Sequence, residues 1–177
     1  MRDHGGMPTI RFAGEEDLDL LADIEDEADL RFVERFHPDG WDPAMNGRLR
    51  ALEQGFLLVA AESADAGPVG FAHVLESDGA HLEQLAVRPG AGRRGHGGAL
   101  VRAALDEAGR RGHRRVTLRT YADVPWNAPF YAAFGFAVSE PDTDFLRGLA
   151  DTERRLGLER YGRRIQMTAT TSVAGPR

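Results

Sequence analysis

The chain has 177 residues, of which 42% are hydrophobic and 28% are charged, and its formal net charge at pH 7 is −6. These values are typical of a globular, single-domain protein, and the acidic balance argues against nucleic acid as its main partner. The chain contains no cysteine and no lysine, which excludes disulfides, thiolate nucleophiles, Schiff-base lysines and the lysine of a Walker A loop. No apolar run approaches the roughly 18 residues of a membrane span, and the first residues lack an apolar signal core, so we expect a cytoplasmic protein that does not bind membranes.

The first half of the chain predicts one strand, two helices and then a run of strands. Apolar residues at spacings of three and four predict an amphipathic helix over 15–36. A second helix is expected over 43–54, with Asp42 as its N-cap and Pro43 at its first position. Apolar and alternating runs bounded by turn residues predict four strands, the second and third forming an antiparallel hairpin: 9–13, 56–63, 69–76 and 80–87.

The second half alternates between helices and strands. The expected elements are a helix over 98–108, a strand over 116–121, a short helix over 127–134, a strand over 135–140, a charged helix over 142–160 and a last strand over 163–170. This order fits one α/β domain over 9–170, with loose tails at 1–8 and 171–177.

Acidic residues are concentrated in the first predicted helix. Nine acids and no base lie between Phe12 and Arg31, whereas the run RRGHRR at 110–115 is basic. Such charge runs are most often solvated surface faces. They could also form an acidic lip that attracts a cationic substrate, and the sequence leaves both interpretations open.

The stretch VRPGAGRRGHGGAL at 87–100 contains a literal G-x-G-x-x-G motif, for which three kinds of phosphate-binding loop compete. A Walker A loop is excluded because His96 and Gly97 stand where it needs Lys and then Ser or Thr. A Rossmann fingerprint is disfavoured because Pro89 delays the helix and because no acid follows at the distance that ribose binding needs.

The third kind of loop uses the later glycines of this stretch. Gly95, Gly97 and Gly98 open the helix that follows, so its first backbone N–H groups are accessible to an anion. Arg93 and Arg94 add charge-assisted hydrogen-bond donors. The pattern therefore predicts a pyrophosphate site at the start of this helix.

The same stretch resembles the acyl-CoA loop of the GNAT superfamily of N-acetyltransferases, whose usual pattern is V-x-P-x-x-[QR]-x-x-G-x-[GA]. Val87, Pro89, Gly95 and Gly97 match this pattern, whereas Gly92 stands where the family usually has Gln or Arg. Because the family's loop works largely through main-chain N–H groups, the resemblance implies reduced side-chain help at Gly92 but retained binding of acyl-CoA.

A second motif, WNAPFYAAFGF at 126–136, is similar to the family's motif of Asn, Tyr and Gly-Phe. The matching residues are Asn127, Tyr131, Gly135 and Phe136. The resemblance follows the order of elements over 9–140, with 163–168 as the family's last strand. It implies a single GNAT-type α/β domain with a mixed, mostly antiparallel central sheet flanked by helices.

The resemblance further implies an enzyme that transfers an acetyl group from acetyl-CoA to a primary amine by direct attack. Tyr131 corresponds to the family's general acid, which protonates the departing thiolate, and Leu85 would polarise the thioester carbonyl through its backbone N–H. The implied contacts to acetyl-CoA are Leu85, Ala86, Val87, Arg93, Arg94, Gly95, His96, Gly97, Gly98, Asn127 and Phe130, with the side chain of His96 expected to be exposed.

Two residues compete for the role of general base, His81 and Glu83, and alternation along the strand places both on one face. A histidine with its ordinary pKa near ~6.5 suits a base at pH 7 better than a glutamate near ~4.3, unless burial raises the pKa of the glutamate. His81 could also lie in solvent at the start of its strand, so the choice stays open. Asn127 is either a helix N-cap, a contact to CoA, or both.

The sequence does not identify the acceptor amine, although the acids of the first helix suggest a small cationic molecule. No metal site is expected, because the histidines do not cluster with acids at metal-ligand spacing. The protein could be a monomer or a homodimer. Two other functions stay open: a module that binds acyl-CoA without turnover, and a nucleotide-binding regulatory domain.

Overall fold

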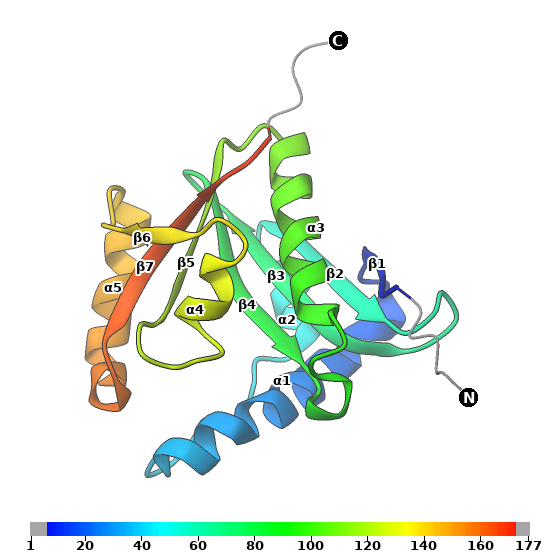
Figure 1. Ribbon diagram of the computed structural model, residues 1–177, viewed down its shortest axis with the longest axis horizontal. Helices are drawn as coiled ribbons and strands as arrows, with labels where there is room; N and C mark the ends of the chain where they lie inside the picture. The colour runs from blue at the N-terminus through cyan, green and yellow to red at the C-terminus, as the bar shows by residue number, and fades with distance from the viewer. Residues whose placement is uncertain (1–6, 173–177) are drawn as a thin grey trace. The chain divides into compact units, whose positions relative to one another are not determined.

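A computed structural model describes residues 7–172 of the chain, so the predicted tails at 1–8 and 171–177 lie mostly outside the described residues. The seven strands are hydrogen-bonded in the order β1-β2-β3-β4-β5-β7-β6, in a mixed sheet flanked by helices (Figure 1). This architecture confirms the predicted α/β fold. The chain separates into two compact units, one of Met1–Val74 and Gln84–Ala104 and the other of Leu75–Glu83 and Leu105–Arg177.

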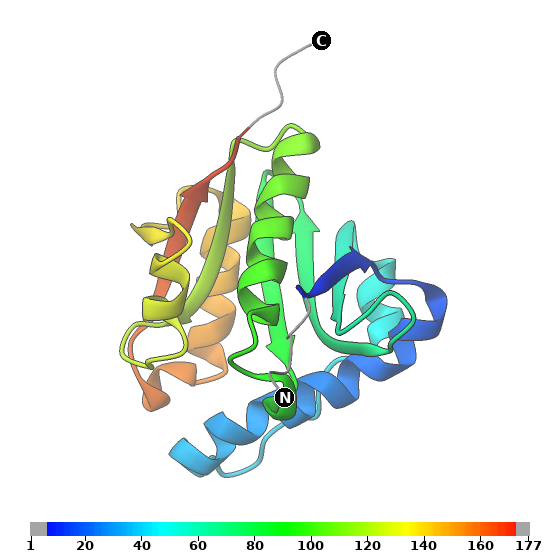
Figure 2. The ribbon, with the colours of Figure 1, turned by 45° about the vertical axis from the view of Figure 1, so that its right-hand side comes forward.

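The first unit packs two helices against its strands, and Figure 2 shows these two helices lying together. Its elements are β1 (Thr9–Phe12), α1 (Glu15–Phe36), α2 (Gly47–Leu52), β2 (Gly55–Ala61) and most of β3 (Pro68–Glu76). β1 and β2 run antiparallel. The apolar stripe of α1 is buried in the core, where each large side chain contributes roughly 1.5–3 kcal/mol. The core side chains are Leu21, Ile24, Leu57, Val59, Phe71 and Ala86.

α2 begins at Gly47, later than predicted, so the predicted N-cap, Asp42, is wrong. Asn46 caps the helix instead, because its side chain accepts a hydrogen bond of 2.8 Å from the backbone N–H of Arg48. α2 starts late because the chain at Gly47 approaches α1 closely, a contact that no local sequence pattern reveals. A Cβ atom at Gly47 would lie only 2.1 Å from the carbonyl oxygen of Leu18, so only glycine fits at this position.

The second unit begins within β3 and contains the start of β4 (Ala80–Val87). Its other elements are β5 (Arg115–Tyr121), α4 (Ala128–Ala132), β6 (Ala137–Ser139), α5 (Asp144–Arg155) and β7 (Arg164–Thr170). β4 and β5 are parallel, whereas β7 runs antiparallel to both β5 and β6. Figure 1 shows α4 and α5 on opposite faces of the ribbon formed by β5 and β7. α3 (His96–Arg110) passes from the first unit into the second.

Three predicted elements of the second unit are shorter than expected. α4 and β6 lie where the sequence predicts them but contain fewer residues. The expected helix over 142–160 is α5 alone, because Gly157 adopts a left-handed φ of 66° and a short 3-10 turn, η2 (Leu158–Tyr161), follows it. Thr143 sets the start of α5, since its side chain accepts a hydrogen bond of 3.2 Å from the backbone N–H of Leu146.

The sheet of the second unit has one apolar face and one polar face. Residues in register on adjacent strands point to the same side of a sheet. The residues in register on the apolar face are Leu82, Leu118 and Met167, and those on the polar face are His81, Thr117 and Thr168. α5 covers the polar face, where its Glu153 accepts a hydrogen bond of 2.8 Å from Arg119 of β5.

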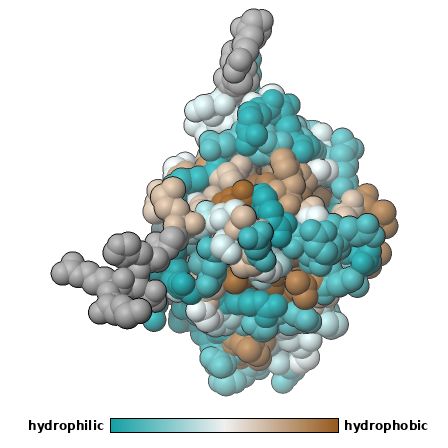
Figure 3. Space-filling model, turned by 90° about the vertical axis from the view of Figure 1, so that its right-hand side faces the viewer, coloured by the Kyte–Doolittle hydropathy of each residue, from teal (hydrophilic) through white to brown (hydrophobic). Residues whose placement is uncertain are grey.

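The surface shown in Figure 3 is mostly hydrophilic, with separate hydrophobic areas. Leu49, Leu52 and Val138 are each more than half exposed. Scattered apolar side chains of this kind are common on protein surfaces and indicate no specific interaction. Across residues 7–172, no helix combines the length and the apolar character that crossing a bilayer requires.

Candidate functional site

The glycine-rich stretch forms a turn that leads into α3, as predicted. A single 3-10 turn, η1 (Pro89–Ala91), is followed by α3, which starts slightly earlier than expected, at His96. Between them, Arg93 and Gly95 adopt left-handed backbone angles, with φ of 59° and 86°. These two residues turn the exposed segment 92–95 into the first turn of a helix of 15 residues. The N–H groups and the dipole at such a helix start attract an anion such as phosphate.

The two arginines of this loop are exposed, and Arg94 forms an ion pair with Glu62 of the same unit. Gly92, which departs from the family pattern, lies in an extended conformation. A Cβ atom there would lie 3.0 Å from the carbonyl oxygen of Pro89, which is tighter than almost all real contacts. A side chain at this position would therefore require a small shift of the turn.

His96 is buried, with 4% of its surface exposed, so the expectation of an exposed side chain is wrong. Its Nδ1 lies 3.2 Å from the carbonyl oxygen of Ala91. The side chain therefore ties the start of α3 to η1.

The end of β4 belongs to the first unit and holds Leu85, Ala86 and Val87. Ala86 is 2% exposed and is part of the core, whereas Leu85 and Val87 are partly exposed. β3 approaches this segment closely, since a Cβ atom at Gly70 would lie 2.8 Å from the carbonyl oxygen of Ala86. The backbone here is therefore held by its neighbour strand.

His81 is buried in the second unit, with 3% of its surface exposed, so a position in solvent is wrong. Its Nδ1 lies 2.8 Å from Oγ1 of Thr117, and its ring meets the ring of Phe145 of α5 edge-on at 5.9 Å between centroids. Burial, followed by the positive charge of Arg119, lowers the pKa of His81 to about 4. His81 is therefore neutral at pH 7 and a weaker base than a free histidine.

Glu83 lies on the same face as His81, as the alternation predicts, with 3.7 Å between Nε2 of His81 and Oε2 of Glu83. Its side chain is 39% exposed, so that water or a substrate can reach the carboxylate. The structure thus pairs one accessible carboxylate with one buried, neutral imidazole. Of the two base candidates, only Glu83 is accessible.

Tyr131 lies in α4 among other aromatic rings. The centroid of its ring is 5.1 Å from that of Phe130 and 5.9 Å from that of Phe136, both in edge-on contact. Desolvation of the phenol raises the pKa of Tyr131 above its ordinary value, although the residue as a whole is partly exposed. The hydroxyl therefore stays protonated at pH 7 and is suited to donating a hydrogen bond.

The motif around Tyr131 fixes its backbone at both ends of α4. Asn127 is the N-cap residue of α4, as predicted, although its side chain makes no capping bond; its carbonyl accepts a bond of 3.1 Å from the N–H of Tyr131. Gly135 adopts a left-handed φ of 87°, which lets the N–H of Phe136 return to the carbonyl of Tyr131 at 3.4 Å. These contacts explain the spacing of the motif.

The polar face under α5 adds residues that the sequence patterns did not single out. Glu153 accepts hydrogen bonds of 2.8 Å from Nε of Arg119 and 2.5 Å from Nη2 of Arg164. Burial raises the pKa of Glu153, but the bonds and charges of these two arginines outweigh it and hold the pKa below its ordinary value. A signal was present, because Thr117 and Arg119 alternate with apolar residues in the strand VTLRTY.

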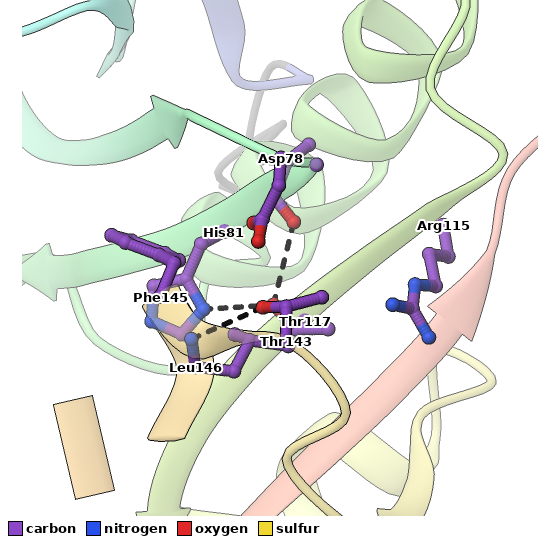
Figure 4. Close-up of a pocket in the computed structure, with 9 residues that line it drawn as sticks. Asp78, His81, Arg115, Thr117, Thr143, Phe145 and Leu146 are labelled. Atoms are coloured by element: carbon purple, nitrogen blue, oxygen red, sulfur yellow. Dashed lines mark hydrogen bonds between the residues drawn. The ribbon is translucent and has the colours of Figure 1, made fainter. Parts of the chain in front are cut away.

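A small hollow lies beside His81 in the second unit (Figure 4). It holds about 240 Å³ of space, including some open solvent, and its lining includes Asp78, His81, Arg115, Thr117 and Phe145. Arg115 is held by Asp142 through two hydrogen bonds of 2.6 and 2.8 Å. The side chains of His81 and Thr117 point toward each other in the wall of this hollow.

The acids of α1 are mostly paired with arginines of the first unit. Five of the nine acids form such pairs: Glu15 and Asp19 with Arg48, Asp17 with Arg11, Glu25 with Arg50, and Glu27 with Arg88. This pairing neutralises much of the charge of the helix. It weakens the interpretation of α1 as an acidic lip for a cationic substrate.

The residues that the sequence singles out fall into two sets. Residues 85–98 lie in the first unit, whereas Asn127, Phe130 and the catalytic candidates His81, Glu83 and Tyr131 lie in the second. In the part of the chain from 7 to 172, no three His, Asp or Glu side chains are grouped so that they could hold a metal ion.

The family model described as "Acetyltransferase (GNAT) family" matches residues 21–136, a segment that contains both motifs. Among solved structures, the ribosomal-protein-S18-alanine N-acetyltransferase from Escherichia coli is 23% identical with a TM-score of 0.65, over 97% of this chain and 98% of that one. The PaiA N-acetyltransferase from Thermoplasma acidophilum, in complex with coenzyme A, is 19% identical with a TM-score of 0.61, over 93% and 99%.

A third similar structure is the N-acetylglutamate synthase from Neisseria gonorrhoeae, complexed with coenzyme A and N-acetyl-glutamate. It is 18% identical with a TM-score of 0.63, over 96% of this chain but 36% of that larger one. At these identities, the three likenesses show a shared fold.

Proposed function

Because the chain belongs to the GNAT family of acetyltransferases, we propose that it is an enzyme that transfers an acetyl group from acetyl-CoA to a primary amine. The observation that carries this proposal is the exposed loop that turns through Arg93 and Gly95 into the start of α3. Such a loop offers backbone N–H groups and a helix dipole to a pyrophosphate. The presence of coenzyme A in the synthase and in PaiA supports the same ligand for this chain.

In this proposal, residues 92–98 bind the pyrophosphate, and Arg93 adds positive charge. The backbone of Leu85, Ala86 and Val87 pairs with the pantetheine arm in the way that an added strand pairs with a sheet. The N–H of Leu85 polarises the thioester carbonyl as an oxyanion donor. Asn127 and Phe130 are proposed as further contacts to CoA.

We assign the general base to Glu83. An alkyl ammonium with a pKa near ~10.4 is almost fully protonated at pH 7, which would add roughly 4–5 kcal/mol to the barrier if the proton stayed. Glu83 is accessible, whereas His81 is buried and has a pKa of about 4. The ammonium proton passes to Oε2 of Glu83, directly or through one water molecule, and the freed nitrogen lone pair attacks the thioester carbon.

We assign Tyr131 to the departing thiolate. An ordinary thiol has a pKa near ~8.5 and an ordinary phenol near ~10, so complete proton transfer from Tyr131 is uphill. The raised pKa of its phenol makes that transfer harder still. Tyr131 therefore acts as a hydrogen-bond donor that stabilises the thiolate as it forms.

For the acceptor, we propose a small cationic amine as the class to test first. The net charge of −6 attracts cations at long range. The pairing of α1 acids with Arg11, Arg48, Arg50 and Arg88 reduces the local charge that could select a polyvalent cation. The proposed class therefore rests on net charge. The cytoplasmic location and the oligomeric state, monomer or homodimer, stay predictions from the sequence.

The test is release of CoA from acetyl-CoA, measured across polyamines, aminoglycosides, arylalkylamines, amino acids and a peptide with a free N-terminus. We expect release with one class of amine, and a loss of about 10-fold or more in Tyr131→Phe, with its melting temperature and acetyl-CoA affinity unchanged. Binding of acetyl-CoA without release for any amine would favour a module that lacks turnover. Thermal stabilisation by NAD or ATP alone would contradict the proposal and favour a nucleotide-binding domain.

A further inference from the structure

We infer that Thr117 of β5 is a positioning residue, which holds His81 in the tautomer whose Nε2 lone pair accepts a hydrogen bond from protonated Glu83. The inference rests on the proposed role of Glu83 as the general base and adds a residue to that site. All three residues lie in the second unit, and His81 and Thr117 are direct neighbours in the parallel pairing of β4 with β5.

The hydroxyl of Thr117 determines which ring nitrogen of His81 carries the proton. Its Oγ1 lies 2.8 Å from Nδ1 of His81, a contact drawn in Figure 4, and 3.4 Å from the carbonyl oxygen of Ala80. A carbonyl oxygen only accepts, so the single hydroxyl proton is donated to Ala80, and the hydroxyl lone pairs accept from His81. Nδ1 therefore carries the ring proton, and Nε2 keeps a lone pair.

Packing keeps the ring of His81 in this orientation. The side chain is 4% exposed, and the ring of Phe145 stands edge-on against it. Nε2 therefore faces Oε2 of Glu83 at 3.7 Å. While Glu83 is ionised, both atoms are acceptors and make no hydrogen bond with each other. Once Glu83 takes a proton, a small movement of its exposed side chain lets the new O–H donate to Nε2.

A hydrogen bond that exists only in the protonated state raises the proton affinity of the carboxylate. A carboxylate of ordinary basicity is a poor base for an ammonium at pH 7, so this contact moves Glu83 toward what the reaction needs. The histidine is suited to this role because it stays neutral, with a pKa of about 4.

The charged groups around His81 leave it neutral, so it can still accept a hydrogen bond at Nε2. Arg119 of β5 disfavours the imidazolium, whereas Glu153 of α5 favours it more weakly. Asp78, in the turn before β4, and Arg115 of β5, which is paired with Asp142, also line the hollow beside His81. Glu83 itself lies on the Nε2 side of the ring.

Thr117→Val keeps the shape of the side chain but removes the acceptor for Nδ1–H. A buried N–H without a partner is unfavourable, so the ring proton moves to Nε2. There the N–H donates to ionised Glu83 and stabilises the carboxylate. This lowers the proton affinity of Glu83, whereas the wild-type contact raises it. Thr117→Ser keeps the hydroxyl and should behave as the wild type. Thr168→Val is the matched control, because Thr168 faces Thr117 across β5 and β7 on the same polar face but bonds to Ser139.

Two measurements on the protein without substrate test the inference. Nitrogen-15 NMR should show His81 protonated at Nδ1 in the wild type, Thr117→Ser and Thr168→Val, and at Nε2 in Thr117→Val. Carbon-13 NMR titration of the Glu83 carboxyl should show its pKa lower by about one unit, a 10-fold change in acid dissociation, in Thr117→Val alone. Thr117→Ala serves as a second variant without the hydroxyl if the valine variant folds poorly.

The same change should appear in catalysis. In Thr117→Val, the acidic limb of the pH profile of kcat/KM should move down by about one unit, with the KM for acetyl-CoA unchanged. Protonation at Nε2 in the wild type, or a Glu83 pKa that does not respond to loss of the hydroxyl, would overturn the inference. If Glu83→Gln keeps full activity, the proposed base is wrong, whereas the two NMR results still decide what Thr117 does to the pair.

Discussion

Each of the two units buries one histidine in a strand, and the two side chains have nearly the same degree of burial. His73 of β3 is 1% exposed and His81 of β4 is 3% exposed. Burial lowers the pKa of both to about 4. Each has Nε2 near a partly exposed carboxylate, with 3.6 Å to Glu53 for His73 and 3.7 Å to Glu83 for His81.

The two histidines differ in what binds Nδ1. Nη1 of Arg50 lies 3.3 Å from Nδ1 of His73, and a guanidinium only donates, so His73 accepts there and carries its proton at Nε2. Thr117 accepts from Nδ1 of His81, so that ring is protonated at the other nitrogen. His73 therefore points an N–H at its carboxylate, whereas His81 points a lone pair at Glu83. Burial and a low pKa do not distinguish a structural histidine from one that supports a base, but the partner of the far nitrogen does.

The largest expected effect is on activity, when loss of the Glu83 carboxylate is compared with loss of the Glu53 carboxylate. Glu83→Gln should lower kcat/KM by about 10²–10⁴-fold, because the ammonium proton loses its acceptor. Glu53→Gln is the matched control, since it removes a similarly exposed carboxylate at nearly the same distance from a buried histidine. The measurement is CoA release at pH 7. Equal activity of the two variants would contradict the claim that Glu83, unlike Glu53, accepts the ammonium proton.

The second effect concerns the stability of the first unit. Arg50 is 5% exposed, binds Glu25 at 2.5 Å and faces His73, so Arg50→Met leaves a buried carboxyl without its cation. We expect a loss of about 3–5 kcal/mol in the free energy of unfolding, measured with urea. The fraction that remains folded should keep its CoA release per molecule. A loss of activity larger than the loss of folded protein would place this cluster in catalysis.

The third effect is a pH dependence of stability with opposite signs for His81 and Glu25. The folded pKa of His81, about 4, lies below the ~6.5 of an unfolded histidine, so the unfolded chain binds more protons between these values. Stability therefore falls on acidification from pH 6.5 to 4, by up to about 3 kcal/mol from His81. Glu25, whose pKa burial raises to about 7, binds its proton more tightly in the folded state and contributes stability that is lost as pH rises from about 4.5 to 7.

Variants separate these two contributions. His81→Gln should partly flatten the rise of stability between pH 4 and 6.5, because it removes one of two acid-sensitive histidines and leaves His73, whose pKa burial also lowers to about 4. Glu25→Gln should steepen it, because the opposing contribution disappears. Urea unfolding at pH 4.5, 5.5 and 7 measures both slopes, and changes of the same sign in the two variants would contradict the assignment of the pKa shifts.

The order of elements and the glycine loop were predictable because both are local. Leu18, Leu21 and Ile24 repeat with the period of α1. The strand patterns and the glycines before α3 are likewise contiguous in sequence. The start of α2 was not predictable, since it depends on contact between Gly47 and the Leu18 carbonyl. No short stretch of the sequence contains both Leu18 and Gly47.

The sequence suggested candidate residues for the site but not their states in the fold. The sequence placed His81 and Glu83 on one face, which is a property of any strand. It left the choice between His81 and Glu83 open, and the ordinary pKa of histidine does not apply here because Phe145 and other residues of α5 bury the ring from a distant part of the chain. The tautomer also depends on a neighbouring strand, through Thr117.

The most direct test of the central claim is the pH profile of kcat/KM for His81→Gln. If Glu83 takes the amine proton and His81 only raises its proton affinity, the variant should keep an acidic limb, shifted to lower pH, and lose about 10-fold or less in its plateau. If the acidic limb disappears and activity falls as far as in Glu83→Gln, His81 itself is the base, and the assignment of Glu83 is contradicted.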